Sequence, residues 1–194
     1  MKEYFKLRNG DEILIRHVKR ADINGIWRNF NEVVEEGIFL PVLFTIDSQF
    51  EKQSWFDNIK KSNELCIVAE NLNLQPPSNN IIGQCEITNI EWDAAMHVGN
   101  LGIIVNKNYR NMGIGKKLIL SAIEESKKIN KKKLVLSCFS NNRRALNLYE
   151  NLGFKKVGIR KRQFLIDSTY YDEVLMELFI NEDFDDVKKL DPLI

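Results

Sequence analysis

Hydrophobic and polar positions along the chain follow two different periods, which predicts a mixture of strands and helices. Over residues 13–18 apolar and polar side chains alternate, the pattern of a half-buried strand. Over residues 22–36 the apolar side chains recur at helical spacing and collect on one face. A second helix is expected to begin after Ser48 and to end near Lys61, because Ser48 followed by Glu51 is a capping-box pattern.

The middle of the chain predicts three further strands, over residues 65–70, 81–92 and 98–105. Pro76 and Pro77 lie between the first two of them. Because proline cannot donate to a β-ladder and interrupts helices, we expect the first two strands to form a hairpin with a flexible connection.

The second half of the chain predicts a helix, a strand, a helix and two strands, over residues 113–129, 133–139, 142–152, 154–166 and 170–180. Gly153 is expected to end the second of these helices, since glycine suits the position just after a helix. The last two strands flank a polar turn and are expected to pair as an antiparallel hairpin.

This order of elements predicts a layered α/β (α+β) fold, with a mixed sheet and helices on both of its faces. The length of 194 residues fits one domain, which we expect over residues 1–180. Residues 181–194 begin with acidic side chains and have no clear period, so they are expected to form a C-terminal tail or a docked segment.

Composition and charge exclude several partners without naming a function. Apolar residues make up 44% of the chain and charged residues 28%, as in ordinary globular proteins. A formal net charge of +1 gives no overall field to attract nucleic acid or an anionic membrane. The basic run over residues 127–133 closes a predicted helix, where cations suit the helix dipole.

The sequence offers no sign of a metal site or of export. Cys66, Cys85 and Cys138 are far apart and lie in apolar segments, so we expect reduced, buried thiols. His17 and His97 are isolated from other metal-binding residue types, and no metal is expected. Without a signal peptide or a long apolar run, the protein is expected to be soluble and cytoplasmic.

The turn after the strand 98–105 carries the clearest chemical signal. Gly113 and Gly115 stand at the start of the next helix, where free backbone N–H groups and the helix dipole favour a phosphate. A Walker loop is excluded because Arg110 replaces its first glycine and Lys117 its Ser or Thr. A dinucleotide fingerprint is weak because Leu118 replaces its third glycine. A glycine turn without a ligand is the remaining structural alternative.

The pattern R-x-x-G-x-G, directly after a strand and opening an amphipathic helix, resembles the acetyl-CoA loop of the GNAT superfamily of N-acetyltransferases. A second segment resembles the family's N-x-x-A-x-x-x-Y-x-x-x-G-F stretch, and its matching residues are Asn142, Ala145, Tyr149, Gly153 and Phe154. The resembling region covers roughly residues 81–176, so it supports the cofactor site better than the acceptor site.

The resemblance implies a mixed, mostly antiparallel central sheet of about seven strands flanked by about four helices, with a splay between the fourth and fifth strands. It also implies acetyl-CoA or coenzyme A as the cofactor. The residues expected to bind it are Ile103, Ile104, Val105, Arg110, Asn111, Met112, Gly113, Ile114, Gly115, Lys116, Asn142 and Tyr149.

The same resemblance assigns catalytic roles. Tyr149 corresponds to the tyrosine that supplies a proton to the leaving thiolate, although a buried core tyrosine is the simpler reading of the residue alone. Glu86, an acidic residue among apolar strand residues, is the first candidate for the general base. Glu35 and Glu36 are a second possibility, and each of the three could also be an ordinary surface glutamate.

The expected function is therefore acetyl transfer from acetyl-CoA to a primary amine by direct attack in a ternary complex. The acceptor could be a small molecule, an amino acid or a protein N-terminus, and homodimerisation is left open. A non-catalytic acyl-CoA-binding or regulatory module with the same fold is the alternative, against which Tyr149 argues.

Overall fold

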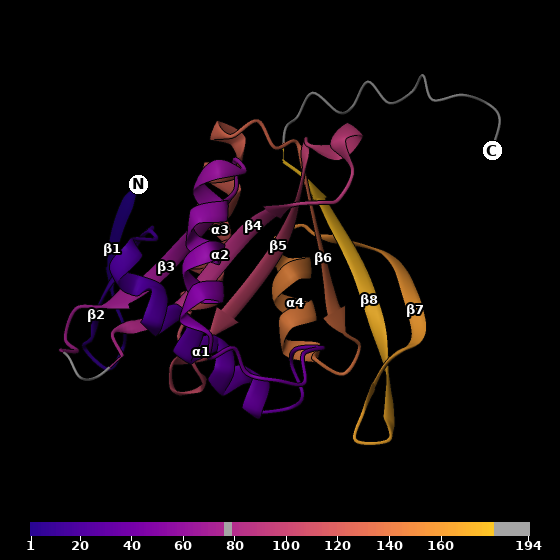
Figure 1. Cartoon of the computed structure of the whole chain (residues 1–194), viewed down its shortest axis with the longest axis horizontal. Helices are drawn as coiled ribbons and strands as arrows, with labels where there is room; N and C mark the ends of the chain where they lie inside the picture. Colours follow the sequence, from indigo (N-terminus) through magenta and orange to yellow (C-terminus); the bar gives the residue numbers. More distant parts are fainter. Residues whose placement is uncertain (76–78, 181–194) are drawn as a thin grey trace.

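A computed structural model describes residues 1–75 and 79–180 and contains one eight-stranded sheet, ordered β1-β2-β3-β4-β5-β6-β8-β7 (Figure 1). The strands are β1 (Lys2–Lys6), β2 (Glu12–His17), β3 (Leu65–Asn71), β4 (Ile81–Asn89), β5 (Val98–Val105), β6 (Lys133–Phe139), β7 (Lys155–Ile166) and β8 (Thr169–Phe179). Neighbouring strands are antiparallel except β5 and β6, which are parallel. The mixed, mostly antiparallel sheet is thus confirmed.

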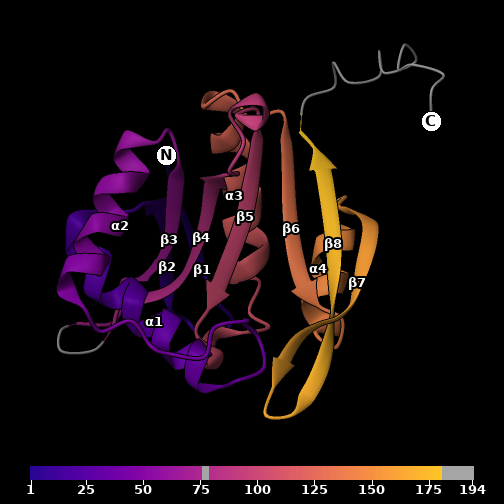
Figure 2. The same cartoon turned by 45° about the vertical axis from the view of Figure 1, so that its right-hand side comes forward.

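Helices cover both faces of this sheet, as the order of elements predicts. The α-helices are α1 (Ile23–Glu35), α2 (Gln49–Lys61), α3 (Ile114–Lys128) and α4 (Arg143–Asn151), and the short 3-10 helices are η1 (Arg20–Asp22), η2 (Asp93–Ala95) and η3 (Lys107–Tyr109). Figures 1 and 2 show α1 and α2 on one face and α3 and α4 on the other. Among the described residues, no helix combines the length and apolarity needed to cross a bilayer.

Two sequence predictions about strands need correction. The sheet has eight strands rather than about seven, because residues 2–6 form an edge strand whose Lys2, Tyr4 and Lys6 face solvent and give no apolar pattern. The strand predicted over residues 81–92 ends at Asn89, since the chain turns there into η2. Residues 76–78 of the connection predicted to be flexible, and the predicted tail at 181–194, lie outside the described residues.

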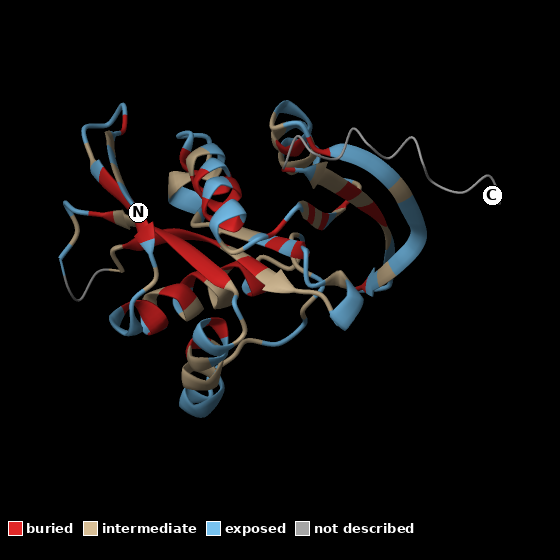
Figure 3. Cartoon of the chain, turned by 90° about the horizontal axis from the view of Figure 1, so that it is seen from above, coloured by how far each residue is buried: buried red, intermediate tan, exposed pale blue. Residues whose placement is uncertain are grey.

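The core lies in two layers, one on each side of the sheet. The larger cluster joins the central strands to α3 and α4 and includes Leu118, Leu134 and Phe154. The smaller cluster lies beneath α1 and α2 and includes Ile26 and Cys66. Figure 3 shows that burial is concentrated in the central strands, whereas β7 at the sheet edge is largely exposed.

The splay predicted between the fourth and fifth strands is present between β5 and β6, one number later because β1 was missed. These strands pair only from Val98 with Lys133 to Asn100 with Val135, and they diverge beyond that point (Figure 2). Gly99 is needed where they meet, because a Cβ there would lie 2.4 Å from a carbon of Ile87. The edge of β5 that faces β6 is therefore unpaired after Asn100.

Candidate active site

A cleft of about 680 Å³ opens where β5 and β6 diverge. Its walls come from β5, the loop and first turn of α3, the end of β6, the first turns of α4 and the α1–α2 connection. Of the residues predicted to bind a cofactor, those lining the cleft are Ile103, Ile104, Val105, Arg110, Asn111, Gly113, Gly115, Lys116, Asn142 and Tyr149. Met112 is exposed in the same loop, and Ile114 is buried beneath it in the core.

The start of α3 forms a cradle of backbone amides. Gly113 precedes the helix with a φ of 84° and offers no side chain to cap it. The first hydrogen bond of the helix runs from the Lys117 amide to the Gly113 carbonyl, at 3.2 Å. The amides of Ile114, Gly115 and Lys116 consequently have no acceptor within the helix. No acidic side chain lies in the first turn, so the cradle fits an anion such as a diphosphate.

Three cations near this cradle have different surroundings. Arg110 donates from both terminal nitrogens to the Glu36 carboxylate, at 2.7 and 2.5 Å, and from Nε to the Val105 carbonyl at 2.9 Å. Lys117 forms an ion pair with Glu3 on β1. Lys116 is exposed at the cleft and has no ion pair within the part of the chain described here.

Asn142 lies at the cleft and is also the N-cap of α4. Its Oδ1 accepts a hydrogen bond from the Ala145 amide at 3.2 Å, which stabilises the first turn of the helix. The side-chain NH₂ of Asn142 has no partner among the described residues and remains able to donate into the cleft.

Tyr149 lies on α4 behind the splay, with only 7% of the residue exposed. Its ring contacts Phe154 edge-on, with 5.9 Å between centroids, and so belongs to the core as well as to the cleft. Burial raises the pKa of the Tyr149 hydroxyl well above its ordinary value, and the nearby thiols of Cys138 and Cys85 raise it further. The hydroxyl is therefore protonated at neutral pH and, within the described residues, has no hydrogen-bond partner.

Glu86 lies on the opposite face of the sheet from Tyr149. It pairs with Cys66, which packs beneath α1 and α2, and with Gly102 of β5, whose missing side chain leaves space beside the carboxylate. Trp55 of α2 donates from Nε1 to Glu86 Oε2 at 3.2 Å. Burial raises the pKa of Glu86 to about 7; the hydrogen bond from Trp55 opposes this shift, and the Glu64 carboxylate adds to it.

The other two glutamates considered as bases are placed differently. Glu35 is exposed at the end of α1. Glu36 follows it and is half-buried, with both carboxylate oxygens accepting hydrogen bonds from Arg110. Glu86 is thus the glutamate of the three that lies in a strand next to β5 and has a raised pKa.

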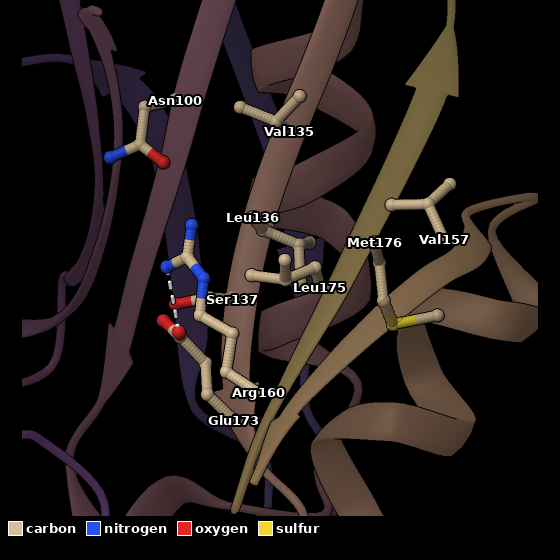
Figure 4. Close-up of a pocket in the computed structure, with 9 residues that line it drawn as sticks. All are labelled: Asn100, Val135, Leu136, Ser137, Val157, Arg160, Glu173, Leu175 and Met176. Atoms are coloured by element: carbon tan, nitrogen blue, oxygen red, sulfur yellow. Dashed lines mark hydrogen bonds and ion pairs between the residues drawn. The ribbon is translucent and has the colours of Figure 1, made fainter. Parts of the chain in front are cut away.

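A second hollow, of about 310 Å³, is lined by residues of the strands β5, β6, β8 and β7 alone. Figure 4 shows Arg160 and Glu173 paired there beside Ser137, and the ion pair measures 2.9 Å. Ser137 lines both this hollow and the large cleft, so the two cavities meet at the diverging edge of β6. The hollow therefore lies next to the cleft along β6.

Comparison with known proteins supplies the family. The model of the acetyltransferase (GNAT) family matches residues 32–154, which is more than half of the chain. The chain belongs to the GNAT acetyltransferase family. The resemblance noted at the glycine turn and at Tyr149 is thereby confirmed at the level of the family.

Individual relatives agree with this assignment. The chain of this GNAT protein is 28% identical over 142 residues to the [ribosomal protein bS18]-alanine N-acetyltransferase of Escherichia coli K12, covering 73% of this chain and 92% of that protein. An N-acetyltransferase structure from Staphylococcus aureus Mu50 has a TM-score of 0.80 at 20% identity, covering 87% of this chain and 99% of the other.

A third comparison is with a structure that contains acetyl-CoA. An acetyltransferase from Salmonella typhimurium, solved with its cofactor acetyl-CoA, has a TM-score of 0.80 at 20% identity, covering 88% of this chain and 95% of that one. At this identity the structures support the shared fold, while the family match carries the activity. The GNAT protein is an acetyl-CoA-dependent N-acetyltransferase.

Sequence reasoning missed several residues of the site. Trp55 was not named as a site residue, although its indole N–H contacts Glu86. Phe39 and Leu40 line the cleft from the connection after Glu35 and Glu36; the family resemblance draws attention to this connection, but neither residue was named for the site. Cys138 is half-buried in the cleft wall rather than fully buried, unlike Cys66 and Cys85. No local signal identifies these contacts, because each joins segments far apart in the chain.

Proposed function

We propose that this GNAT enzyme, with residues 1–180 as its single catalytic domain, transfers the acetyl group to a primary amine by direct attack in a ternary complex. Two observations carry the proposal: a protonated Tyr149 lines the cleft, and Glu86, with its pKa raised to about 7, lies on the opposite face of the sheet beside Gly102, which also lines the cleft. A proton donor in the cleft and a proton acceptor on the opposite face of the sheet suit a transfer between two substrates that approach from different faces.

The proposed cofactor site runs from the edge of β5 to the first turns of α3 and α4. When bound, acetyl-CoA supplies the activated acetyl group as a thioester. The amides of the cradle hold the diphosphate, and backbone groups on the unpaired edge of β5, along Ile103, Ile104 and Val105, pair with the extended arm as a neighbouring strand would. Lys116 adds positive charge at the cradle, and Asn142 donates to the arm from the opposite wall.

The proposed chemistry uses two side chains and the strand edge. Glu86 removes a proton from the acceptor amine, directly or through a water molecule. Tyr149, whose raised pKa keeps the hydroxyl protonated at neutral pH, donates its proton to the departing sulfur. A backbone N–H near the end of β5 stabilises the negative charge that develops on the carbonyl oxygen.

The acceptor is proposed to reach the splay from the face that carries Glu86, where Gly102 leaves room. The class of amine remains broad: small amines, amino acids and protein N-termini all fit a direct transfer. Because one relative is named for the alanine terminus of ribosomal protein bS18, a peptide beginning with alanine belongs in the first panel of acceptors.

The test is thiol release from acetyl-CoA across a panel of amines, comparing the native chain with Tyr149→Phe. Native turnover with at least one amine, and a kcat reduced roughly a hundredfold or more in the variant, is the expected result. Coenzyme A affinity should fall far less than kcat, because the aromatic ring in the cleft wall is kept, and this separates catalysis from binding. Tight coenzyme A binding without turnover on any amine would instead favour a non-catalytic acyl-CoA-binding module.

A further inference from the structure

Arg110 stands at the first position of the glycine turn, yet its guanidinium is engaged by protein groups outside the amide cradle. Nη1 and Nη2 donate to the two oxygens of Glu36 at 2.7 and 2.5 Å, and Nε donates to the Val105 carbonyl at 2.9 Å. The guanidinium carbon lies 4.8 Å from the centre of the Phe39 ring. The arginine is thus held on three sides by protein groups.

The ion pair between Arg110 and Glu36 is of the kind that resists exchange for another partner. The two side chains are only 20% and 22% exposed, and the contact is bidentate. A phosphate that bound Arg110 could use only the N–H groups left over by Glu36 and Val105, next to a carboxylate that repels it. Displacing that carboxylate instead would leave it partly buried without a counter-ion. Lys116, exposed at the same cleft without an ion pair among the described residues, can approach a phosphate without that cost.

A second contact fastens the same segment to the same helix. Asn106, which follows β5, donates from Nδ2 to Glu32 Oε2 at 2.7 Å. Glu32 and Glu36 are one helical turn apart, so both lie on the same side of the end of α1. The segment between Val105 and Arg110 is therefore tied at both of its ends to the last turn of α1.

The end of α1 leads directly to one wall of the cleft. Gly37 follows Glu36 with a φ of 69°, and the chain then supplies Phe39 and Leu40, which line the cleft. Helix α1 covers the same sheet face as Glu86. The contact between Arg110 and Glu36 consequently joins the cofactor turn to the wall on the side of Glu86.

We infer that Arg110 is a positioning residue, which holds the wall formed by Phe39 and Leu40 against the cofactor turn through Glu36 and does not bind the diphosphate. The part of this inference that concerns the acceptor rests on the proposed function. The two basic residues of the glycine turn then have separate roles. Lys116 attracts the phosphates of the cofactor, and Arg110 positions the wall of the cleft on the acceptor side.

A double-mutant cycle tests this assignment. Arg110→Gln, Glu36→Gln and the double variant are compared for coenzyme A affinity by calorimetry, and for kcat and KM with the amine that turns over fastest in the panel. We expect the acceptor KM to rise roughly five- to tenfold in all three variants, with kcat and coenzyme A affinity within about twofold of native. The double variant should match the single ones, because the two residues act as a pair.

Two further variants sharpen the cycle. Arg110→Lys should not restore the acceptor KM, since lysine cannot make the two-pronged contact. Lys116→Gln should have the opposite effect on the two quantities: coenzyme A binding should weaken, and the acceptor KM should stay unchanged. A loss of coenzyme A affinity of tenfold or more in Arg110→Gln but not in Glu36→Gln would overturn the inference.

If no amine turns over, the proposed function is contradicted, but the inference about Arg110 can still be tested by hydrogen exchange. Amides of residues 37–44 should exchange faster in Arg110→Gln and in Glu36→Gln than in the native chain. Amides in the rest of the described chain should exchange at native rates. Unchanged exchange in this segment in both variants would show that the ion pair does not hold the wall.

Discussion

The two sides of the β5 edge differ in the kind of group that they offer to a ligand: backbone groups on one side and side chains on the other. On the α3 side, binding groups are backbone amides at a helix start and a strand edge without a partner. On the α1 and α2 side, the groups are side chains: Glu86 held by Trp55, and Phe39 held by Arg110. The first side depends on conformation, and the second depends on contacts between distant segments.

This difference determines how each side responds to change. A backbone site tolerates substitution of its side chains but fails when a residue cannot adopt the required φ. A site made of side chains responds to the loss of one charge or one hydrogen bond, and to pH when a carboxylate has a pKa of about 7. Substitutions on the two sides should therefore affect different measured quantities.

The largest effect is expected from Glu86→Gln on the side-chain side. Because the carboxylate must be ionised to take a proton, native activity should rise as the pH increases through about 7, and the variant should lack this rise. We expect kcat/KM to fall roughly a hundredfold at pH 8, with coenzyme A affinity retained. The ratio of native to variant activity removes the acceptor's own protonation from the comparison.

Glu91→Gln is the matched control, since Glu91 is an exposed glutamate just beyond the same strand. It should leave the activity and its pH dependence unaltered. A Glu86→Gln variant with native rates above pH 7 would remove Glu86 from the mechanism and leave a water molecule or the free amine as the base.

On the backbone side, Gly113→Ala should weaken coenzyme A binding about tenfold, because its φ of 84° is unfavourable for alanine and the cradle amides would move. Gly10→Ala is the matched control. Gly10 has a φ of 95°, and a Cβ at either glycine would meet no atom within 4 Å. Both variants should lose about 1 to 2 kcal/mol of stability, measured by denaturant unfolding. Equal loss of coenzyme A affinity in both would contradict a local role for Gly113.

The backbone side was also the one that could be predicted from the sequence. Gly113 and Gly115 follow a strand and open a helix, so local spacing alone indicates an anion site. The capping pattern at Ser48 likewise fixed the start of α2, where Ser48 Oγ accepts from the Glu51 amide at 3.3 Å. Features of this kind are encoded within one turn or one period of the chain.

The side-chain side was predictable only in part. Glu86 drew attention as an acid in an apolar strand, but nothing near Trp55 in the sequence indicates that the two residues touch across 31 positions. The contact between Glu36 and Arg110 joins residues 74 positions apart, and neither partner has a distinctive neighbour. β1 was missed for a different reason: at a sheet edge, its solvated side chains have no strong apolar alternation.

A smaller effect is expected from Trp55→Phe, which keeps an aromatic ring but removes the indole N–H. That hydrogen bond lowers the pKa of Glu86, so its loss should raise the pKa and move the rise in activity to higher pH. At pH 7 the rate should fall roughly three- to tenfold, while the rate at high pH should recover. A uniform decrease at every pH would indicate that Trp55 acts by packing against Trp27 instead.

The smallest effect is expected from Lys117→Gln, although Lys117 directly follows Lys116 in the first turn of α3. Lys117 pairs with Glu3, and its ammonium lies 5.1 Å from the centre of the Phe5 ring, so it points toward β1 rather than into the cleft. Coenzyme A affinity should change less than about twofold, and stability by about 0.5 kcal/mol, because an exposed ion pair contributes little.

Calorimetry at low and high salt separates a direct phosphate contact from a general effect of charge. If Lys117→Gln weakened binding as much as Lys116→Gln at both salt concentrations, the backbone cradle would be too weak to hold the diphosphate without a ring of cations, and the contrast between the two sides of β5 would fail.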